Sequence, residues 1–272
     1  VKLHVLSHGL HYGSCVFEGE RVYNGNVFKL REHTERLITS AKTLGFEIPY
    51  SLDEIESATL ATVEAQGYED AYVRPVAWRG SEMMGVSAQQ STIHLAIAVW
   101  EWPSYFSPEA RMQGIKLKWA PYKRPSPECA PVHSKAAGLY MICTLSKHAA
   151  EADGFDDALM LDWRGQIAET TGANVFLVID DVIHTPTPDC FLNGITRRSV
   201  MDLARGHGIE IIERAIMPEE LSKAAEIFVT GTAAEVTPVS QIDNMKFGVG
   251  PITKMLLADY DQLVREPLRA NT

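Results

Sequence analysis

The chain has 272 residues, of which 46% are hydrophobic and 22% charged, and this ordinary globular balance excludes a largely disordered protein. Its 25 Lys and Arg residues against 35 Asp and Glu residues give a formal net charge of −10, which argues against general binding of nucleic acid but allows a local basic pocket for one small anion. At roughly 150 residues per domain, the length predicts about two domains.

The N-terminal hundred residues are predicted to form strands around two helices. One helix is predicted over residues 30–44, where Leu37, Ala41 and Leu44 share a face. Ser51 and Glu54 have the spacing of a capping box, and the second helix is predicted to run from them to Gly67. Strands are predicted at residues 1–7, 14–23, 70–78 and 92–100.

Residues 101–113 (EWPSYFSPEARMQ) contain two prolines and little periodicity, and they are predicted to connect two domains. Elements resume beyond them, with predicted strands at 115–120, 157–162, 166–170, 174–179 and 226–230 and predicted helices at 136–152, 196–205 and 251–264. The expected fold class is α/β (α+β), with a small N-terminal α/β domain over 1–100 and a large domain over 114–272.

The sequence contains no stretch near the ~20 apolar residues that span a bilayer, and no signal peptide is visible, so no membrane partner is expected. The chain begins at Val1 without a Met, which we interpret as a lost leading strand. None of its cysteines forms a C-x-x-C pair, which argues against a zinc or redox motif and favours free thiols in a reducing compartment such as the cytoplasm. The cysteines are Cys15, Cys129, Cys143 and Cys190.

Two segments carry backbone N–H groups and hydroxyls that suit a phosphate. Gly194 precedes a predicted helix whose unpaired N–H groups attract anions, and we expect Thr196 to cap it. Residues 229–233 form a second segment, with Gly231 and hydroxyls after a strand. Each alone is also typical of a plain cap or turn; together with Arg36 on an early helix, they would suit one phosphate.

Lys135 stands at the start of a predicted apolar helix. A solvated lysine is the ordinary interpretation. A cation at a helix N-terminus opposes the helix dipole, however, and that environment would lower the pKa of the amine, as a nucleophilic lysine requires. Glu169 interrupts an otherwise uncharged β-rich stretch, either as an exposed strand carboxylate or as a buried one that pairs with a pyridinium nitrogen.

Tyr72 and Arg74 are two residues apart on a predicted strand and therefore point to the same face. Their hydroxyl and guanidinium could hold a carboxylate. The alternative is a rim pair on an edge strand, which Pro75 supports.

Several segments, taken in order along nearly the whole chain, resemble one family. They are residues 8–13, 16–19, 30–37, 72–75, 135–138, 169–174, 194–197 and 231–238, which include His8-Gly9-Leu10-His11-Tyr12-Gly13, Lys135-Ala136-Ala137-Gly138 and Gly231-Thr232-Ala233-Ala234-Glu235. The chain is similar to fold-type-IV pyridoxal-phosphate enzymes, and most to branched-chain amino-acid aminotransferases. Ala137 and Leu139 depart from the Gly and Asn common in that family, and the usual opening hairpin is absent before Val1.

The resemblance implies a two-domain architecture and roles for the cofactor-binding residues. Lys135 would form a Schiff base with pyridoxal 5′-phosphate and move the proton between substrate Cα and cofactor C4′. Glu169 would pair with the pyridine nitrogen, and Tyr140 would bind the phenolic oxygen. Leu192 would pack on the ring, and the phosphate ligands would be Arg36, Ile195, Thr196 and Thr232.

The resemblance also implies the substrates, which are L-leucine, L-isoleucine and L-valine with 2-oxoglutarate. Tyr72 and the backbone of Thr232 and Ala233 would hold the α-carboxylate, and Arg74 would meet the distal carboxylate of glutamate. An apolar pocket would be lined by Tyr12, Phe17, Met84, Val86, Trp102 and Tyr105. The site would lie near the interface of a homodimer or larger homo-oligomer, with no metal.

Three alternatives stay open on the sequence. The first is a transaminase for D-amino acids or (R)-amines, against which the Tyr72 and Arg74 pair favours an amino-acid carboxylate. The second is aminodeoxychorismate lyase, which uses the same lysine and cofactor. The third is a non-catalytic cofactor-binding relative, which the presence of Lys135, Tyr140 and Glu169 disfavours.

Overall fold

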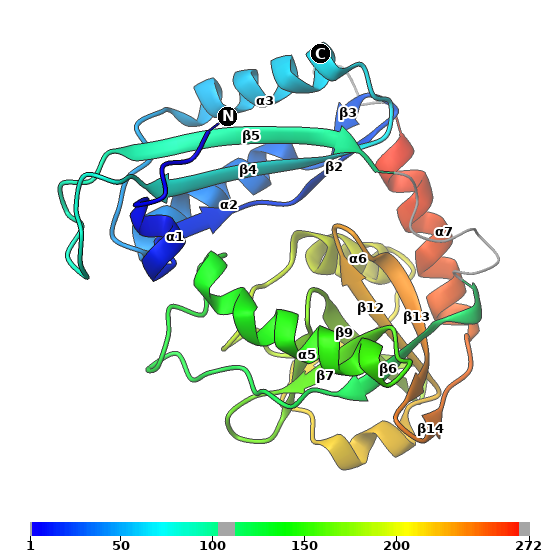
Figure 1. The fold of residues 1–272 in the computed structure, drawn as a ribbon. Coiled ribbons are helices and arrows are strands. Elements are labelled where there is room, and N and C mark those ends of the chain that lie inside the picture. Colours follow the sequence, from blue (N-terminus) through cyan, green and yellow to red (C-terminus); the bar gives the residue numbers. More distant parts are fainter. Residues whose placement is uncertain (1, 103–111, 267–272) are drawn as a thin grey trace. The chain divides into compact units, whose positions relative to one another are not determined.

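Residues 131–141 pack with the N-terminal part of the chain, although they lie near the middle of the sequence. In the computed structural model, which describes residues 2–102 and 112–266, contacts divide the chain into two units (Figure 1). The first unit is Val1–Pro103 with Pro131–Met141, and the second is Ser104–Ala130 with Ile142–Thr272. This division breaks inside the expected connector but differs from the expected domains in one respect, because Lys135 belongs to the first unit.

The first unit is built on a five-stranded antiparallel sheet with the order β1-β4-β2-β3, in which β5 pairs with β4. Its elements are α1 (His8–Tyr12), β1 (Cys15–Phe17), β2 (Glu20–Tyr23), β3 (Asn26–Val27), α2 (Leu30–Thr43), α3 (Leu52–Gln66), β4 (Ala71–Arg79), β5 (Ile93–Glu101) and the 3-10 helix η1 (Ala137–Tyr140). Because β1 and β2 occupy one edge of β4 and β5 occupies the other, β4 is a central strand.

Helices α2 and α3 cover one face of this sheet and confirm both predicted helices (Figure 1). The predicted capping box is formed, since the N–H of Ser51 donates to Glu54 and the N–H of Glu54 donates to the Ser51 hydroxyl. Val73 and Ala77 of β4 point toward the helices and are fully buried. The alternation of a strand therefore directs Tyr72, Arg74 and their neighbours to the opposite face.

The prediction of a strand over residues 1–7 is wrong. His4 organises a turn instead, because its ring accepts a hydrogen bond from the N–H of Leu6 and its carbonyl accepts from the N–H of Ser7. Helix α1 follows at His8 and ends at Gly13, which has a left-handed φ of 69°.

The second unit contains a nine-stranded sheet with the order β11-β10-β9-β12-β13-β6-β7-β8, in which β14 pairs with β13. Its elements are β6 (Ile115–Trp119), α5 (Met141–Ala152), β7 (Asp157–Leu161), β8 (Ile167–Thr170), β9 (Asn174–Ile179), β10 (Val182–Pro186), α6 (Ile195–Gly206), β11 (Ile211–Arg214), the 3-10 helix η2 (Pro218–Lys223), β12 (Glu226–Gly231), β13 (Glu235–Ile242), β14 (Met245–Lys246) and α7 (Pro251–Arg265). A further pairing of Glu169 with Asn174 joins β8 to β9 and closes six of these strands into a ring.

Apolar side chains fill the core of this unit, among them Leu117, Leu159, Val175 and Val229. Helices α6 and α7 pack against each other and against β12 and β13 (Figure 1). The strand predictions at 115–120, 157–162, 166–170, 174–179 and 226–230 are confirmed within a residue or two. Among the described residues, no helix has the length and apolar character needed to cross a membrane.

Candidate active site

Lys135 is anchored beside β1 of the first unit. Its carbonyl accepts a hydrogen bond from the N–H of Phe17 at 3.2 Å, and its own N–H donates to the hydroxyl of Ser40 at 3.0 Å. Its Nζ donates to the hydroxyl of Tyr140 at 3.0 Å and lies 5.2 Å from the ring centroid of Phe17. Contacts from β1, α2 and η1 therefore hold Lys135 in place, and two of them, from Tyr140 and Phe17, reach its amine.

The prediction of an α-helix starting at residue 136 is only partly right. Ala136 is extended and forms a bridge with Val16, and the 3-10 helix η1 comes before α5. Lys135 therefore does not stand at an α-helix N-terminus. The expectation that its pKa is lowered is wrong: burial acts to lower it, but the Tyr140 oxygen and the Glu18 carboxylate together raise the pKa of Lys135.

A buried carboxylate, Glu18, organises the charges near Lys135. It accepts hydrogen bonds from Nε and Nη2 of Arg36 at 2.6 and 2.7 Å and from Nδ1 of His33 at 2.7 Å. Burial acts to raise the pKa of Glu18, but Arg36 and His33 hold it well below its usual range. Burial lowers the pKa of His33, so this imidazole acts as a neutral donor. Within the described ranges, Nη1 of Arg36 forms no hydrogen bond and stays available to an anion.

Tyr72 and Arg74 meet on the open face of the first sheet. Nη2 of Arg74 donates to the Tyr72 hydroxyl at 3.2 Å, and the guanidinium carbon lies 4.7 Å from the ring centroid of Phe17. A Cβ at Gly19 would overlap the Tyr72 hydroxyl, so this close approach requires glycine. The edge-strand alternative is wrong, because β4 is paired on both sides. The N and the carbonyl of one strand residue point to the same side, and the Pro75 carbonyl accepts from the N–H of Glu18 in the short gap between β1 and β2. The missing N–H of Pro75 therefore faces this gap, where neither strand pairs with it.

Aromatic rings extend this face toward the end of β5. The centroids of Trp100 and Trp102 lie 5.1 and 5.0 Å from that of Tyr72. Trp102, one of the predicted pocket residues, is thus placed with Tyr72 and Phe17. Tyr105 lies outside the described residues.

The other predicted pocket residues are exposed. Tyr12 on α1 is 51% exposed, and Met84 and Val86 are 76% and 84% exposed. His8 links these segments, because its ring stacks on Tyr12 with a centroid distance of 4.5 Å and its Nε2 is 3.0 Å from the Gly85 carbonyl. The first unit by itself therefore leaves these three apolar side chains uncovered.

A β-bulge sets the direction of Glu169 in the second unit. Ile167 is opposite Leu161, but Glu169 is opposite Met160, so Ala168 is the extra residue. The bulge places Glu169 on the same face as Met160 and Asn174, its partners on β7 and β9. The side chain is 14% exposed, which disagrees with the exposed-carboxylate alternative.

Both oxygens of Glu169 have polar partners. Nε of Arg124 is 3.3 Å from Oε1, and the Asn174 side-chain amide donates to Oε2 at 3.4 Å. Nη1 of Arg124 also donates to Sγ of Cys143 at 3.6 Å, and burial raises the pKa of that thiol to about 11, so it is neutral.

The N-terminus of α6 presents unpaired N–H groups. Its N-cap is Gly194 and not Thr196, which is the second helical residue. A Cβ at Gly194 would overlap the side-chain oxygen of Asn174, so a larger residue would displace the amide that donates to the Leu192 carbonyl at 3.1 Å. Ile195 and Thr196 are 3% and 4% exposed, and their N–H groups form no hydrogen bond within the described part of the chain. Buried, unpaired N–H groups in the first turn fit an anion.

Thr232 and Ala233 occupy the turn between β12 and β13. The strand leading to this turn runs beside β9, with Thr230 opposite Asn174. The Thr230 hydroxyl is buried and has no hydrogen-bond partner among the described residues. Like the N–H groups of Ile195 and Thr196, the Thr230 hydroxyl is thus a polar group without a partner among the described residues, and it lies on the strand next to Asn174.

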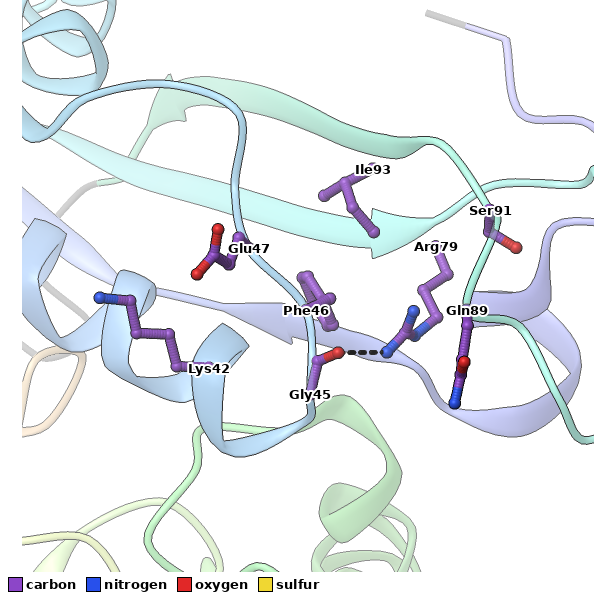
Figure 2. Close-up of a pocket in the computed structure, with 8 residues that line it drawn as sticks. All are labelled: Lys42, Gly45, Phe46, Glu47, Arg79, Gln89, Ser91 and Ile93. Atoms are coloured by element: carbon purple, nitrogen blue, oxygen red, sulfur yellow. Dashed lines mark hydrogen bonds between the residues drawn. The ribbon is translucent and has the colours of Figure 1, made fainter.

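A separate hollow of about 450 Å³ on the first unit holds none of the predicted site residues (Figure 2). It is lined by Lys42, Gly45, Phe46, Glu47, Arg79, Gln89, Ser91 and Ile93. Arg79 donates to the carbonyls of Leu44, Gly45 and Ala88, so its guanidinium ties loops to β4.

The predicted site residues thus form two sets. The first unit places Lys135, Tyr140, Phe17, Arg36, Tyr72, Arg74 and Trp102 together. The second places Glu169, Leu192, Ile195, Thr196, Thr232 and Ala233 on neighbouring elements. Sequence reasoning missed Glu18, His33, Ser40, Arg124 and Asn174. Glu18 offered a signal, as a charge inside a predicted strand, whereas Ser40 and Arg124 become visible only through the fold.

Comparisons with known proteins agree over nearly the whole chain. The model of the amino-transferase class IV family matches residues 15–242. A branched-chain-amino-acid aminotransferase of Pseudomonas aeruginosa is 42% identical over 268 residues, which are 96% of this chain and 87% of that protein.

Solved structures give the same relationship. The T.th. branched-chain amino acid aminotransferase with pyridoxamine 5′-phosphate has a TM-score of 0.95 and 40% identity, covering 98% of this chain and 91% of that one. Structures of the same enzyme with N-(5′-phosphopyridoxyl)-L-glutamate and with 4-methylvaleric acid have TM-scores of 0.93 and 0.92, 39% identity and the same coverage. The chain belongs to the amino-transferase class IV family.

Proposed function

We propose that this chain transfers amino groups between L-leucine, L-isoleucine or L-valine and 2-oxoglutarate, with pyridoxal 5′-phosphate as cofactor. The observation that carries the proposal is the half-buried Lys135, whose Nζ donates to Tyr140 beside an arginine and an aromatic face. The relatives named for this reaction and the structures with pyridoxamine phosphate and phosphopyridoxyl-glutamate support it.

The residues fit the cofactor at each of its functional groups. The unpaired N–H groups of Ile195 and Thr196 suit a phosphate, and the carboxylate of Glu169 suits a protonated ring nitrogen. Lys135 supplies the amine that holds the aldehyde carbon. When bound, the cofactor supplies an electron sink for the carbanion at the substrate Cα.

Lys135 performs the proton transfer. With the cofactor bound, Nζ of Lys135 would be the base that removes the proton from the substrate Cα and the acid that returns it. Tyr140 keeps Nζ in place through their hydrogen bond. It would also form a hydrogen bond to the phenolic oxygen of the cofactor. Phe17 covers this region, because its ring contacts both Tyr140 and Lys135.

The second unit holds the rest of the cofactor. Glu169 keeps the ring nitrogen protonated, and Arg124 and Asn174 fix the two carboxylate oxygens that do so. Leu192 packs on the ring. The N–H groups of Ile195 and Thr196 would hold the phosphate together with Thr232, and the free Nη1 of Arg36 would be a further ligand.

The substrate side combines a carboxylate site with an apolar wall. Tyr72 and the backbone of Thr232 and Ala233 bind the α-carboxylate, and Arg74 binds the distal carboxylate of glutamate. The branched side chain meets the aromatic face, in which Phe17 and Trp102 flank Tyr72 and Arg74. Tyr105 is assigned to the same wall.

A second copy of the chain is the proposed macromolecular partner. Tyr12, Met84 and Val86 are exposed on the first unit, and His8 contacts both Tyr12 and the segment that carries Met84 and Val86. Large apolar side chains exposed in one area are typical of an interface. A homodimer or larger homo-oligomer would cover them and bring them to a substrate pocket. The four free cysteines support a cytoplasmic location, and the net charge of −10 argues against nucleic acid as a partner.

An amino-donor panel tests the function. The purified protein is mixed with 2-oxoglutarate and, in turn, L-leucine, L-isoleucine, L-valine, D-alanine and (R)-1-phenylethylamine, and glutamate formation is measured. We expect the three L-amino acids to give the highest kcat/KM. Preference for D-alanine or the amine would contradict the proposal, and release of pyruvate from aminodeoxychorismate would point to a lyase.

A further inference from the structure

Arg197 is a fully buried arginine in the first turn of α6 and belongs to neither set of predicted site residues. It is 1% exposed, and its charge is paired with Glu213 of β11 through a 2.7 Å contact. A cation in the first turn of a helix opposes the helix dipole, and a buried charge is costly unless it is well paired. Local helix stability therefore does not explain why an arginine stands here.

The contacts of Arg197 close a loop. The segment between β10 and α6 leaves the sheet at Pro186 and enters the helix after Asn193. Nη2 of Arg197 donates to the Pro186 carbonyl at 3.2 Å, and Nη1 donates to the Asn193 side-chain oxygen at 2.9 Å. One planar guanidinium thus bonds both ends of the loop, a geometry that the point charge of a lysine cannot reproduce.

This loop delivers the groups that the proposed cofactor site uses. Leu192 lies within it, and Gly194 and Ile195 follow directly as the N-cap and first residue of α6. On its other side the loop is held by Asn174, which donates to the Leu192 carbonyl and also contacts Glu169. Arg164 also pairs with Asp189 of the loop, and Arg198 donates to the Asn193 carbonyl. Arg197 differs from these anchors because it bonds both the Pro186 end and the Asn193 end.

We infer that Arg197 is a positioning residue that sets the phosphate-binding end of α6, acting through Asn193 and Pro186 and not by touching the phosphate. The inference rests on the proposed function, which assigns the N-terminus of α6 to the cofactor phosphate. It predicts that Arg197 matters for the phosphorylated cofactor and not for pyridoxal, which has the same ring and aldehyde but lacks the phosphate.

The test is the ratio of two dissociation constants on the cofactor-free full-length protein. Binding of pyridoxal 5′-phosphate and of pyridoxal is measured by absorbance titration for the wild type and for Arg197→Met. We expect the affinity for pyridoxal 5′-phosphate to fall about tenfold, the size of one good hydrogen-bond contribution, with pyridoxal changed less than about twofold. Equal losses for both ligands would mean general damage to the fold and would overturn the inference.

Three further variants complete the experiment. Arg197→Lys keeps the charge but not the double contact, and it should lose most of the same discrimination. Asn193→Ala removes one loop contact without leaving a buried charge unpaired, so it replaces Arg197→Met if that variant fails to fold. An unchanged ratio of the two dissociation constants in Asn193→Ala would overturn the inference. Arg205→Met is the matched control on the last turn of α6, where the exposed arginine pairs with Asp202, and it should leave the ratio unchanged.

Cofactor binding by the wild type distinguishes failure of the proposed function from failure of the inference about Arg197. If the unaltered protein binds pyridoxal 5′-phosphate no more tightly than pyridoxal, the assignment of α6 to the phosphate fails and the inference fails with it. If the wild type discriminates and the ratio is unchanged in Arg197→Met, the proposed function stands and only the inference about Arg197 is overturned.

Discussion

The charge state of Lys135 depends on what surrounds its Nζ more than on where it stands in the sequence. Burial disfavours an ammonium ion, but the Tyr140 oxygen at 3.0 Å and the Glu18 carboxylate favour it, and together they raise the pKa of Lys135. The cofactor-free site therefore holds a protonated lysine, which must lose a proton before it can attack an aldehyde.

Tyr140→Phe should make that proton loss easier. The variant keeps the ring on Phe17 but removes the oxygen that favours the ammonium form, so the pKa of Lys135 should fall. The rate of covalent attachment of pyridoxal 5′-phosphate, measured against pH, should reach its midpoint at a lower pH than in the wild type. Tyr122→Phe, at an exposed tyrosine of the second unit, is the control. An unchanged or higher midpoint would contradict the assignment.

Arg74→Ala should separate the two substrate types. Glutamate loses a charged hydrogen bond of roughly 1–3 kcal/mol, whereas leucine offers no distal carboxylate to lose. We expect kcat/KM for glutamate to fall by a much larger factor than for leucine. Arg79→Met on the same strand is the matched control, because Arg79 donates to the carbonyls of Gly45 (Figure 2) and Ala88 and should affect stability alone. Equal losses for both substrates in Arg74→Ala would show that Arg74 does not bind the distal carboxylate of glutamate.

At the scale of elements, the sequence predicted those whose signals are local. The capping box at Ser51 and the stop at Gly67 define α3, and the spacing of Leu37 and Ala41 defines α2. Residues 1–7 look like a strand from their apolar content, but a turn around His4 prevents pairing. The strands β10, β11 and β13 were not predicted, because their pairing partners are set by the sheet and not by their own residues.

The N-terminus of helix α7 is capped by a residue of another element. Its N-cap, Gly250, has no side chain, and the buried Glu226 of β12 instead accepts hydrogen bonds from the N–H groups of Ile252 and Thr253 at 3.2 and 2.7 Å. A carboxylate at a helix N-terminus stabilises it through both the hydrogen bonds and the dipole.

Glu226→Ala should therefore lower the free energy of unfolding by about 1–3 kcal/mol, because two N–H groups lose a charged acceptor. Glu226→Gln keeps one oxygen acceptor and should fall between the alanine variant and the wild type. Both are compared by chemical unfolding followed by circular dichroism. An alanine variant as stable as the wild type would show that water replaces the carboxylate at no cost.

At the scale of the whole molecule, the proposed cofactor-binding residues were easier to predict than the residues that position them. Lys135 and Glu169 stand out because a charge in an apolar segment is visible in the sequence. Their supports are not visible: a bulge sets the direction of Glu169, and a turn in which the N–H of Thr170 donates to the Ala173 carbonyl brings Asn174 opposite it. The place of residues 131–141 was also hidden, since only the contacts show that they pack with the first unit.

The formal charge of −10 treats every carboxylate alike, but Glu20 differs from the others. It is fully buried on β2, and neither of its oxygens has a hydrogen-bond partner among the described residues. Burial raises the pKa of Glu20 well above its ordinary value of about 4.5, the nearby Glu18 and Glu56 raise it further, and Arg36 opposes them.

This shift links stability to pH. Below pH 4 the carboxyl is protonated in both folded and unfolded chains, so its contribution to stability is fully present. As the pH rises, the unfolded chain releases the proton while the folded chain still holds it, and stability is lost until the pH passes the raised folded-state pKa. Glu20→Met removes the titrating group and keeps an unbranched side chain of similar length, so its free energy of unfolding should exceed that of the wild type at pH 8.

The advantage of Glu20→Met should shrink as the pH falls toward 4, and chemical unfolding at a series of pH values measures it. Glu64→Met, at an exposed glutamate on α3, should change stability by the same small amount at every pH. An advantage that does not vary with pH would mean that the variant acts through apolar packing alone. Only an advantage that grows with pH shows that the fold holds Glu20 protonated beside the Glu18 and Arg36 pair.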